Sequence, residues 1–220
     1  LLGSDANESL TTRELGARGI TVKIGQSAEL IEAEHTINPI DWFVYTAALP
    51  SDHPELAKAR ELGIRTSKRD ELLAHIINEK NLKLIAVSGT HGKTTTTGMM
   101  VWAFKQAGIP VSYSVGSTLS FGPSGHYDPE SDYFVYECDE FDRNFLHFNP
   151  TLSLVTSIGY DHSDTYPTKD DYLQAFSSFI AQSAHGIGWR HDLKRLPELD
   201  GGKLWQLADD EVATIRLAGE

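Results

Sequence analysis

Short apolar runs alternate with helical stretches over the first 79 residues of the chain. This alternation is typical of a parallel α/β layer, because each buried strand needs a helix to return the chain to the same edge of the sheet. The pattern predicts helices over residues 8–18, 52–62 and 69–79 and strands over residues 20–24 and 42–45. Asp52 is expected to cap the second of these helices, since an aspartate oxygen can accept hydrogen bonds from the first turn.

A polar break at residues 78–81 separates this layer from a second series of strands, so we expect two domains, residues 1–79 and 80–220. The pattern of the second domain predicts a helix over 99–107 and strands over 82–87, 111–115, 133–136, 152–158, 204–207 and 212–217. A polar loop over 116–129 is either a substrate lid or a simple surface connection.

A Gly- and Thr-rich segment lies between the predicted strand 82–87 and the predicted helix 99–107, the order that a phosphate-binding loop needs. Gly89 and Gly92 let the backbone bend with its N–H groups turned inward, and the helix N-terminus adds partial positive charge. Lys93 supplies a full charge, and Thr94 a hydroxyl for Mg²⁺. The residues expected to bind nucleotide phosphates are Gly89, Thr90, His91, Gly92, Lys93, Thr94 and Thr95.

This segment departs from the longer G-x-x-x-x-G-K-[ST] pattern, because Val87 stands where that pattern has a glycine. The shorter form from Gly89 to Thr94 is present. The alternative interpretation is a turn that only caps a helix, with Lys93 in solvent. The flanking strand and helix favour the phosphate loop.

Acidic residues and a histidine follow two other predicted strands. Four carboxylates lie within residues 137–142, and their mutual repulsion is offset if a divalent cation binds among them. Glu137 and Asp139 are expected on one side of the chain and Cys138 on the other, in the core. His162 follows the strand 152–158. Because ligands bind outside the carboxyl ends of parallel strands, the sequence predicts a metal–nucleotide site at this edge.

The charge balance narrows the choice of partners. With 19 basic and 31 acidic residues the formal net charge is −12, which argues against a general nucleic-acid or anionic-membrane surface. No apolar run approaches the length of a membrane span, and no signal peptide opens the chain, so we expect a cytoplasmic protein. The single cysteine agrees with a reducing compartment.

Three blocks of sequence, residues 89–96, 137–147 and 161–166, together resemble the Mur ligase family, ATP-dependent enzymes that form amide bonds in peptidoglycan synthesis. They are most similar to the members that join L-alanine to UDP-N-acetylmuramate. The resemblance implies a Rossmann-like UDP-binding layer that lacks its first strand and glycine-rich loop. It also implies a P-loop-type central ATPase domain with a mainly parallel sheet.

The resemblance also implies a mechanism. ATP phosphorylates the substrate carboxylate to an acyl phosphate, which the amine of the amino acid then attacks. Lys93, Glu137 and His162 would be the catalytic residues, and Thr94, Glu137 and His162 the Mg²⁺ ligands. A histidine ligand is unusual for Mg²⁺, so that assignment rests on the family. The residues expected near the substrates are Asp5, Thr46, His91, Asp139 and His147.

Asp5 has an argument of its own. If residues 1–2 close a strand, Asp5 follows its carboxyl end, where an acidic residue accepts hydrogen bonds from ribose hydroxyls. An aspartate of an ordinary turn is the alternative.

We further expect the chain to be clipped at both ends, with a missing C-terminal domain that would complete the active site. No lysine lies between residues 172 and 184, so a carbamylated lysine found in some relatives should be absent. Two other enzymes remain open, a ligase that attaches murein tripeptide to UDP-N-acetylmuramate and a folylpolyglutamate synthase-like ligase. A P-loop regulatory module that only binds nucleotide is the non-enzyme alternative.

Overall fold

The computed structural model describes residues 1–197, 199 and 201–207 and divides the chain into two compact units, Leu1–Leu72 and Leu73–Glu220. The expected strand over 212–217 lies outside the described residues. The expected boundary after residue 79 coincides with the end of helix α4 (Arg69–Glu79), whereas the compact units divide inside that helix.

The first unit carries two separate pairs of parallel strands, β1 with β2 and β3 with β4. Its elements are β1 (Leu2–Asp5), α1 (Leu10–Ala17), β2 (Thr21–Ile24), α2 (Ala28–Ile37), β3 (Trp42–Tyr45), α3 (Pro54–Glu61) and β4 (Arg65–Lys68). A small core forms where Ile31 of α2 packs with Ala59 of α3 and Ile64.

The sequence pattern placed some of these elements well and missed others. The strand 42–45 and the helix 69–79 have the predicted bounds. The prediction that Asp52 caps α3 is wrong, because the helix begins at Pro54 and its N-cap is His53, which makes no side-chain cap hydrogen bond. A proline at the first helical position has no N–H to satisfy, so this end needs a side-chain cap less than most. Helix α2 and strand β4 were not predicted, and the strand expected to close at residues 1–2 is β1, which ends at Asp5.

The second unit is built on a seven-stranded sheet in the order β11-β10-β9-β5-β8-β6-β7. All pairs are parallel except β6 with β7, which confirms the mainly parallel sheet. The elements are β5 (Lys83–Ser88), α5 (Lys93–Gln106), β6 (Ser112–Ser114), β7 (Gly125–His126), β8 (Tyr133–Glu137), η1 (Phe141–His147), β9 (Leu152–Val155), α6 (Lys169–Gln182), β10 (His185–Trp189), α7 (Arg190–Leu193), η2 (Gly201–Lys203) and β11 (Leu204–Leu207).

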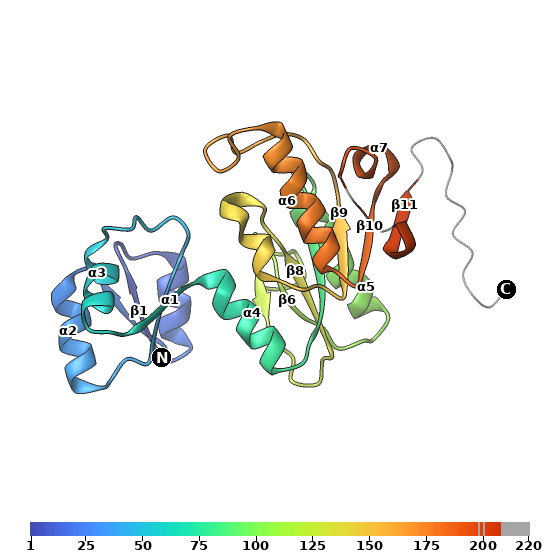
Figure 1. Ribbon diagram of the computed structural model, residues 1–220. Coiled ribbons are helices and arrows are strands. Elements are labelled where there is room, and N and C mark those ends of the chain that lie inside the picture. Colours follow the sequence, from blue (N-terminus) through green and yellow to red (C-terminus); the bar gives the residue numbers. More distant parts are fainter. Residues whose placement is uncertain (198, 200, 208–220) are drawn as a thin grey trace. The chain divides into compact units, whose positions relative to one another are not determined.

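Helices cover both faces of this sheet, and Figure 1 shows α5 and α6 on its two sides. The side chains of β5 alternate accordingly. Leu84 and Ala86 pack in one core with Phe176 of α6, whereas Ile85 packs in the other with Val101 of α5. Strand β5 is thus buried on both faces, as is usual for the central strand of a parallel sheet.

The helix after the Gly- and Thr-rich segment is longer than predicted, because it begins at Lys93 rather than at Met99. Gly92 allows this start, since it adopts a left-handed conformation with φ of 86°. Val87 lies inside β5 and is fully buried. The chain therefore needs no glycine at this position, because it has not yet left the strand.

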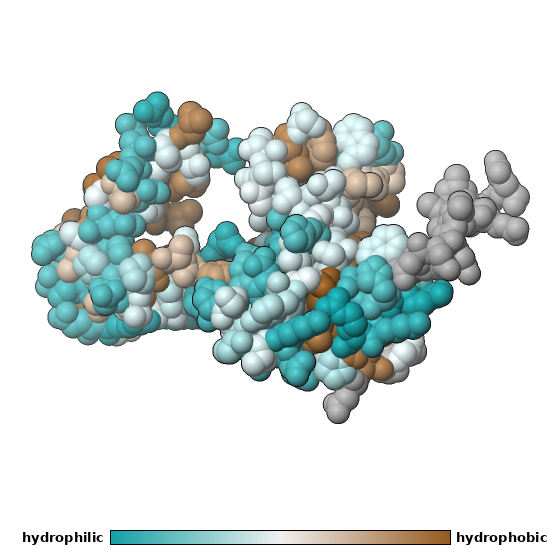
Figure 2. Space-filling view, turned by 90° about the horizontal axis from the view of Figure 1, so that it is seen from above, coloured by the Kyte–Doolittle hydropathy of each residue, from teal (hydrophilic) through white to brown (hydrophobic). Residues whose placement is uncertain are grey.

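The surface is mostly hydrophilic on the face that Figure 2 shows, where hydrophobic side chains form separate small patches. Of the helices in the described part of the chain, none is both long and apolar enough to cross a membrane.

Candidate functional site

The loop between β5 and α5 depends on a glycine at position 89. Gly89 has a φ of 133°, and a Cβ there would lie 2.4 Å from Thr156 Oγ1 and 2.8 Å from the backbone of Ser157. Any side chain would therefore push the loop away from the end of β9. The backbone of His91 binds the same neighbour, since its N–H donates to Ser157 Oγ at 3.0 Å.

The first turn of α5 opens onto a crevice of about 310 Å³. Gly92 offers no side-chain cap, so the N–H groups of the first turn can serve an anion. The crevice is lined by Thr90, His91, Gly92, Lys93, Thr94, Thr95 and Glu137. The structure thus brings six of the seven expected phosphate-binding residues, all except Gly89, and the first acid of the carboxylate block to one crevice.

Lys93 is held inside this site rather than extended into solvent. Its Nζ donates hydrogen bonds to the carbonyl of Gly89 and to Glu140 Oε2, both at 2.8 Å, and lies 3.8 Å from Asp139 Oδ1. The Lys93 side chain is 16% exposed. These two hydrogen bonds hold the ammonium group at the loop, and its third N–H can donate to a ligand.

Glu137 is fixed by two donors. The hydroxyl of Thr94 donates to its Oε1 at 2.7 Å, and the backbone N–H of Gly116 donates to its Oε2 at 2.6 Å. A Cβ at Gly116 would lie only 2.8 Å from Oε1, so a larger residue would displace the carboxylate. A hydroxyl and a carboxylate in contact are oxygen ligands of the kind that Mg²⁺ prefers, so this pair fits the predicted cation.

Glu140 is one of two acids of the block, with Asp142, that the sequence analysis did not assign to the site. Its side chain is fully buried, and burial raises the pKa of its carboxyl, while the hydrogen bond and charge of Lys93 oppose the rise. Its Oε1 has no hydrogen-bond partner in the described structure and lies 3.6 Å from His162 Nε2. The possible ligand atoms of Asp139, Glu140 and His162 lie within 4.8 Å of one another. His162 therefore faces Glu140, and its predicted partnership with Glu137 on a cation stays a prediction.

The remaining predicted residues of this unit have different surroundings. The Thr90 hydroxyl ties the loop to the segment after β9, because it contacts the carbonyl of Gly159 at 2.8 Å and the Tyr172 hydroxyl at 2.9 Å. His91 is exposed at the crevice. His147 is exposed at the end of η1. Cys138 is fully buried, as expected for a core residue.

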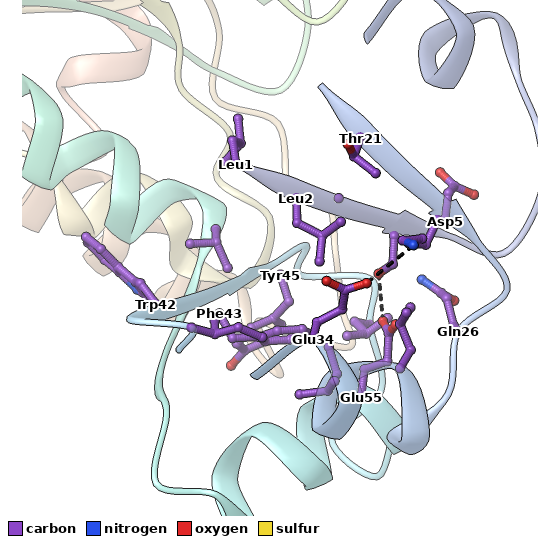
Figure 3. Close-up of a pocket in the computed structure, with 18 of the residues that line it drawn as sticks. Leu1, Leu2, Asp5, Thr21, Gln26, Glu34, Trp42, Phe43, Tyr45 and Glu55 are labelled. Atoms are coloured by element: carbon purple, nitrogen blue, oxygen red, sulfur yellow. Dashed lines mark hydrogen bonds and ion pairs between the residues drawn. The ribbon is translucent and has the colours of Figure 1, made fainter. Parts of the chain in front are cut away.

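A second hollow lies within the first unit. This groove of about 1070 Å³ is lined by the whole of β1 and β3, and its lining includes the predicted substrate residues Asp5, at the end of β1, and Thr46, directly after β3. The two strands belong to separate sheets in the described structure, and Figure 3 shows their side chains around the groove, with Glu34 and Glu55 from α2 and α3. The Ser4 hydroxyl donates to Glu55 Oε2 at 2.8 Å, while Glu55 Oε1 has no hydrogen-bond partner among the described residues.

Comparison with known proteins accounts for both units. Residues 1–81 match the model described as Mur ligase family, catalytic domain, and residues 87–192 match the Mur ligase middle domain. The chain belongs to the Mur ligase family. The three sequence blocks that suggested this family all lie in the second unit of the chain, and two of them, 89–96 and 137–147, supply the residues that line the crevice at the start of α5.

Curated members of the family are similar over most of this chain. The UDP-N-acetylmuramate–L-alanine ligase of Streptomyces avermitilis is 39% identical over 84% of this chain and 38% of its own length. The ligase of the same name from Streptomyces coelicolor is 38% identical over 99% of this chain and 43% of its own. The chain thus spans about two fifths of these relatives.

Solved structures show the same fold. The UDP-N-acetylmuramate–alanine ligase of Thermotoga maritima is 26% identical, with a TM-score of 0.75 over 87% of this chain and 44% of that chain. A UDP-N-acetylmuramate:L-alanyl-γ-D-glutamyl-meso-diaminopimelate ligase from Neisseria reaches a TM-score of 0.77 at 23% identity, covering 94% of this chain and 68% of that one.

Proposed function

We propose that this chain is the UDP-binding and ATP-binding part of a ligase that joins L-alanine to UDP-N-acetylmuramate. One observation carries the proposal: Lys93, the open first turn of α5 and the Thr94–Glu137 pair border one crevice. The names of the similar curated proteins support the choice of substrates. We also propose that this protein is cytoplasmic.

The residues of the crevice suit transfer of a phosphoryl group between two anions. The N–H groups of the first turn and the third N–H of Lys93 would hold phosphate oxygens and offset their charge. Thr94 and Glu137 would hold Mg²⁺, with His162 completing a second cation site in the proposal. Bound Mg²⁺ supplies positive charge at the phosphate oxygens.

In the proposed reaction the muramoyl carboxylate takes the γ-phosphoryl group of ATP and becomes an acyl phosphate. The amine of L-alanine then attacks the carbonyl carbon, phosphate leaves with the former carboxylate oxygen, and the amine loses a proton. His91, Asp139 and His147 are proposed to lie near the muramoyl group or the amine. A further C-terminal domain is proposed to complete the amino-acid site.

The first unit would hold the UDP group of the substrate. Asp5 is the last residue of β1 and Thr46 directly follows β3, so both lie at the carboxyl ends of parallel strands, where ligands bind, and this position supports their assignment to one ligand-binding region. The groove separates two parallel pairs of strands, and the strand that we expected to be missing would pair with both. Asp5 also accepts a hydrogen bond from the N–H of Asn7 at 3.1 Å, so the ordinary turn aspartate remains the alternative.

The Lys93→Ala variant tests the nucleotide site. Titration calorimetry with ATP and Mg²⁺ should show binding to the unchanged chain and a loss of at least tenfold in affinity in the variant, because a charged hydrogen bond to phosphate disappears. The matched control is Lys105→Ala on the same helix, whose Nζ instead donates to the carbonyl of Phe121. Equal ATP affinity in Lys93→Ala and the unchanged chain would contradict the proposal.

Acceptor specificity separates the enzymes that remain open. In a protein that contains this chain, phosphate release with L-alanine but not with tripeptide or glutamate supports the proposed substrate. Release with tripeptide alone favours the murein tripeptide ligase, and release with glutamate a folylpolyglutamate synthase-like enzyme. Rapid ATP hydrolysis without any UDP-sugar would instead favour the regulatory P-loop module.

A further inference from the structure

Glu140 is buried beside the crevice and binds Lys93, which lines it. One of its oxygens accepts a hydrogen bond from Lys93 Nζ at 2.8 Å, and the other lies 3.6 Å from His162 Nε2. Its backbone is also anchored, because its carbonyl accepts a hydrogen bond from the Tyr166 hydroxyl at 2.5 Å. The residue therefore joins the phosphate loop, the acid block and the segment that carries His162.

The unpaired oxygen of Glu140 is unusual for a purely structural ion pair. The Glu140 side chain is completely buried from solvent. Its Oε1 accepts no hydrogen bond in the described structure. Buried polar atoms are nearly always paired, so an unpaired carboxylate oxygen calls for an explanation. Here that atom belongs to the group of possible cation ligands formed with Asp139 and His162.

The charges around Lys93 do not favour a free anion. The ammonium is matched by Glu140 at 2.8 Å and by Asp139 at 3.8 Å, and Glu137 holds the neighbouring Thr94. One positive side chain thus stands among three carboxylates. Phosphates that enter alone meet net negative charge, whereas phosphates that enter with a divalent cation do not.

We propose that Glu140 is a positioning residue that holds the Lys93 ammonium over the phosphate loop and, by matching its charge, makes the binding of nucleotide phosphates depend on a divalent cation. This inference rests on the proposed function, because it assigns a role within the same nucleotide site. It concerns the residue that holds Lys93, not the residues already proposed to touch phosphate or Mg²⁺.

The test measures ATP affinity by calorimetry in the presence of Mg²⁺ and in the presence of a chelator. In Glu140→Gln the shape of the side chain is kept but its charge is lost, so metal-free ATP should bind about tenfold more tightly than it binds the unchanged chain. The ratio between the two conditions should shrink by the same factor. Glu140→Asp keeps the charge but shortens the reach, so it should keep the metal dependence while binding Mg²⁺–ATP several-fold more weakly.

The charge-matched control is Glu130→Gln, an exposed residue before the start of β8, at the end of the strand opposite Glu137. It should leave both affinities unchanged. Melting temperatures show that each variant is folded before its affinities are compared.

The outcomes separate the inference from the function on which it rests. If Glu140→Gln lowers both affinities by one common factor, or leaves the ratio unchanged, Glu140 does not set the metal dependence and the inference is overturned. If the unchanged chain binds ATP under neither condition, the proposed function fails, and the inference fails with it. If Lys93→Ala abolishes ATP binding but binding to Glu140→Gln still depends on the metal, the results support the proposed function and overturn the inference.

Discussion

The ion pair between Lys93 and Glu140 allows a quantitative test on stability. The two charges are 2.8 Å apart, and the Lys93 side chain is 16% exposed whereas that of Glu140 is not exposed at all. At an effective dielectric constant of about 20, their attraction is roughly 6 kcal/mol before the cost of taking both from water. Most of that attraction only offsets the cost of desolvation. The loss of stability in a variant therefore depends on which of the two charges remains buried without its partner.

The two single variants should therefore differ. Lys93→Met leaves a buried carboxylate without its cation, which should cost about 3 kcal/mol, the lower end for a broken buried pair because Lys93 is partly exposed. Glu140→Gln leaves an ammonium that can reach solvent or Asp139, at a cost of about 1 kcal/mol. The double variant should cost about 1 kcal/mol, so that the two changes are coupled by roughly 3 kcal/mol.

Hydrogen exchange of the β5 amides measures this effect in the second unit alone, because these amides open with its core. The melting temperature of Lys93→Met should fall by roughly 6–12 °C, at about 2–4 °C per kcal/mol for a unit of this size. Additive effects, in which the double variant is less stable than the unchanged chain by the sum of the two single losses, would refute the reasoning. A smaller loss in Lys93→Met than in Glu140→Gln would refute it as well.

Two further predictions concern a glycine and a buried acid. Gly89→Ala should destabilise the second unit by about 2–4 kcal/mol, because its Cβ would collide with Thr156 and φ is 133°; an unchanged melting temperature contradicts this. Burial raises the pKa of the Glu55 carboxyl above 4.5, although the Ser4 hydrogen bond opposes the rise. The folded state then binds this proton more tightly, so stability is full below about pH 4.5 and falls as the pH rises through the raised pKa. Glu55→Gln should flatten that fall in denaturant titrations from roughly pH 4 to 8, and an identical slope in the variant would contradict it.

The sequence was most informative where local chemistry decides the structure. The apolar strand 42–45 and the helix 69–79 were predicted with the bounds that the structure shows, and so was the strand 204–207. The strand, loop and helix order around Gly89 was also predictable, because two glycines and a lysine between an apolar strand and a helix are typical of a phosphate-binding loop.

Tertiary packing explains most of the differences. Helix α5 begins six residues before the predicted start, in a run of threonines whose helix propensity is low. Packing outweighs that propensity, since Thr97 is fully buried and its hydroxyl donates to the carbonyl of Lys93. Helix α6 was missed although Thr168 and Asp171 form a capping box at its start, which is a local signal that the sequence does contain.

Glu140 could not be singled out from the sequence, because nothing local distinguishes it from its acidic neighbours. Glu137, Asp139 and Glu140 differ in what the fold places beside them. Glu137 accepts a hydrogen bond from Thr94 in the first turn of α5. The Asp139 side chain is 46% exposed, whereas that of Glu140 is buried in contact with Lys93. Their different surroundings arise where β8 ends and the chain turns into η1, and that turn depends on contacts with the segment after β9.

Backbone strain gathers in the segments next to Glu140. Four non-glycine residues of the described chain have positive φ, and three of them, Asp142, Arg143 and His162, lie in the two segments joined by Glu140. Each such conformation costs on the order of 1 kcal/mol or more and persists only where the surroundings enforce it. Here the Tyr166 hydroxyl and the N–H of Arg143 both donate to the carbonyl of Glu140. The fold therefore accepts strain and an unpaired buried oxygen in order to hold an acid, a lysine and an imidazole in fixed positions, which a site for a charged ligand requires and a surface turn does not.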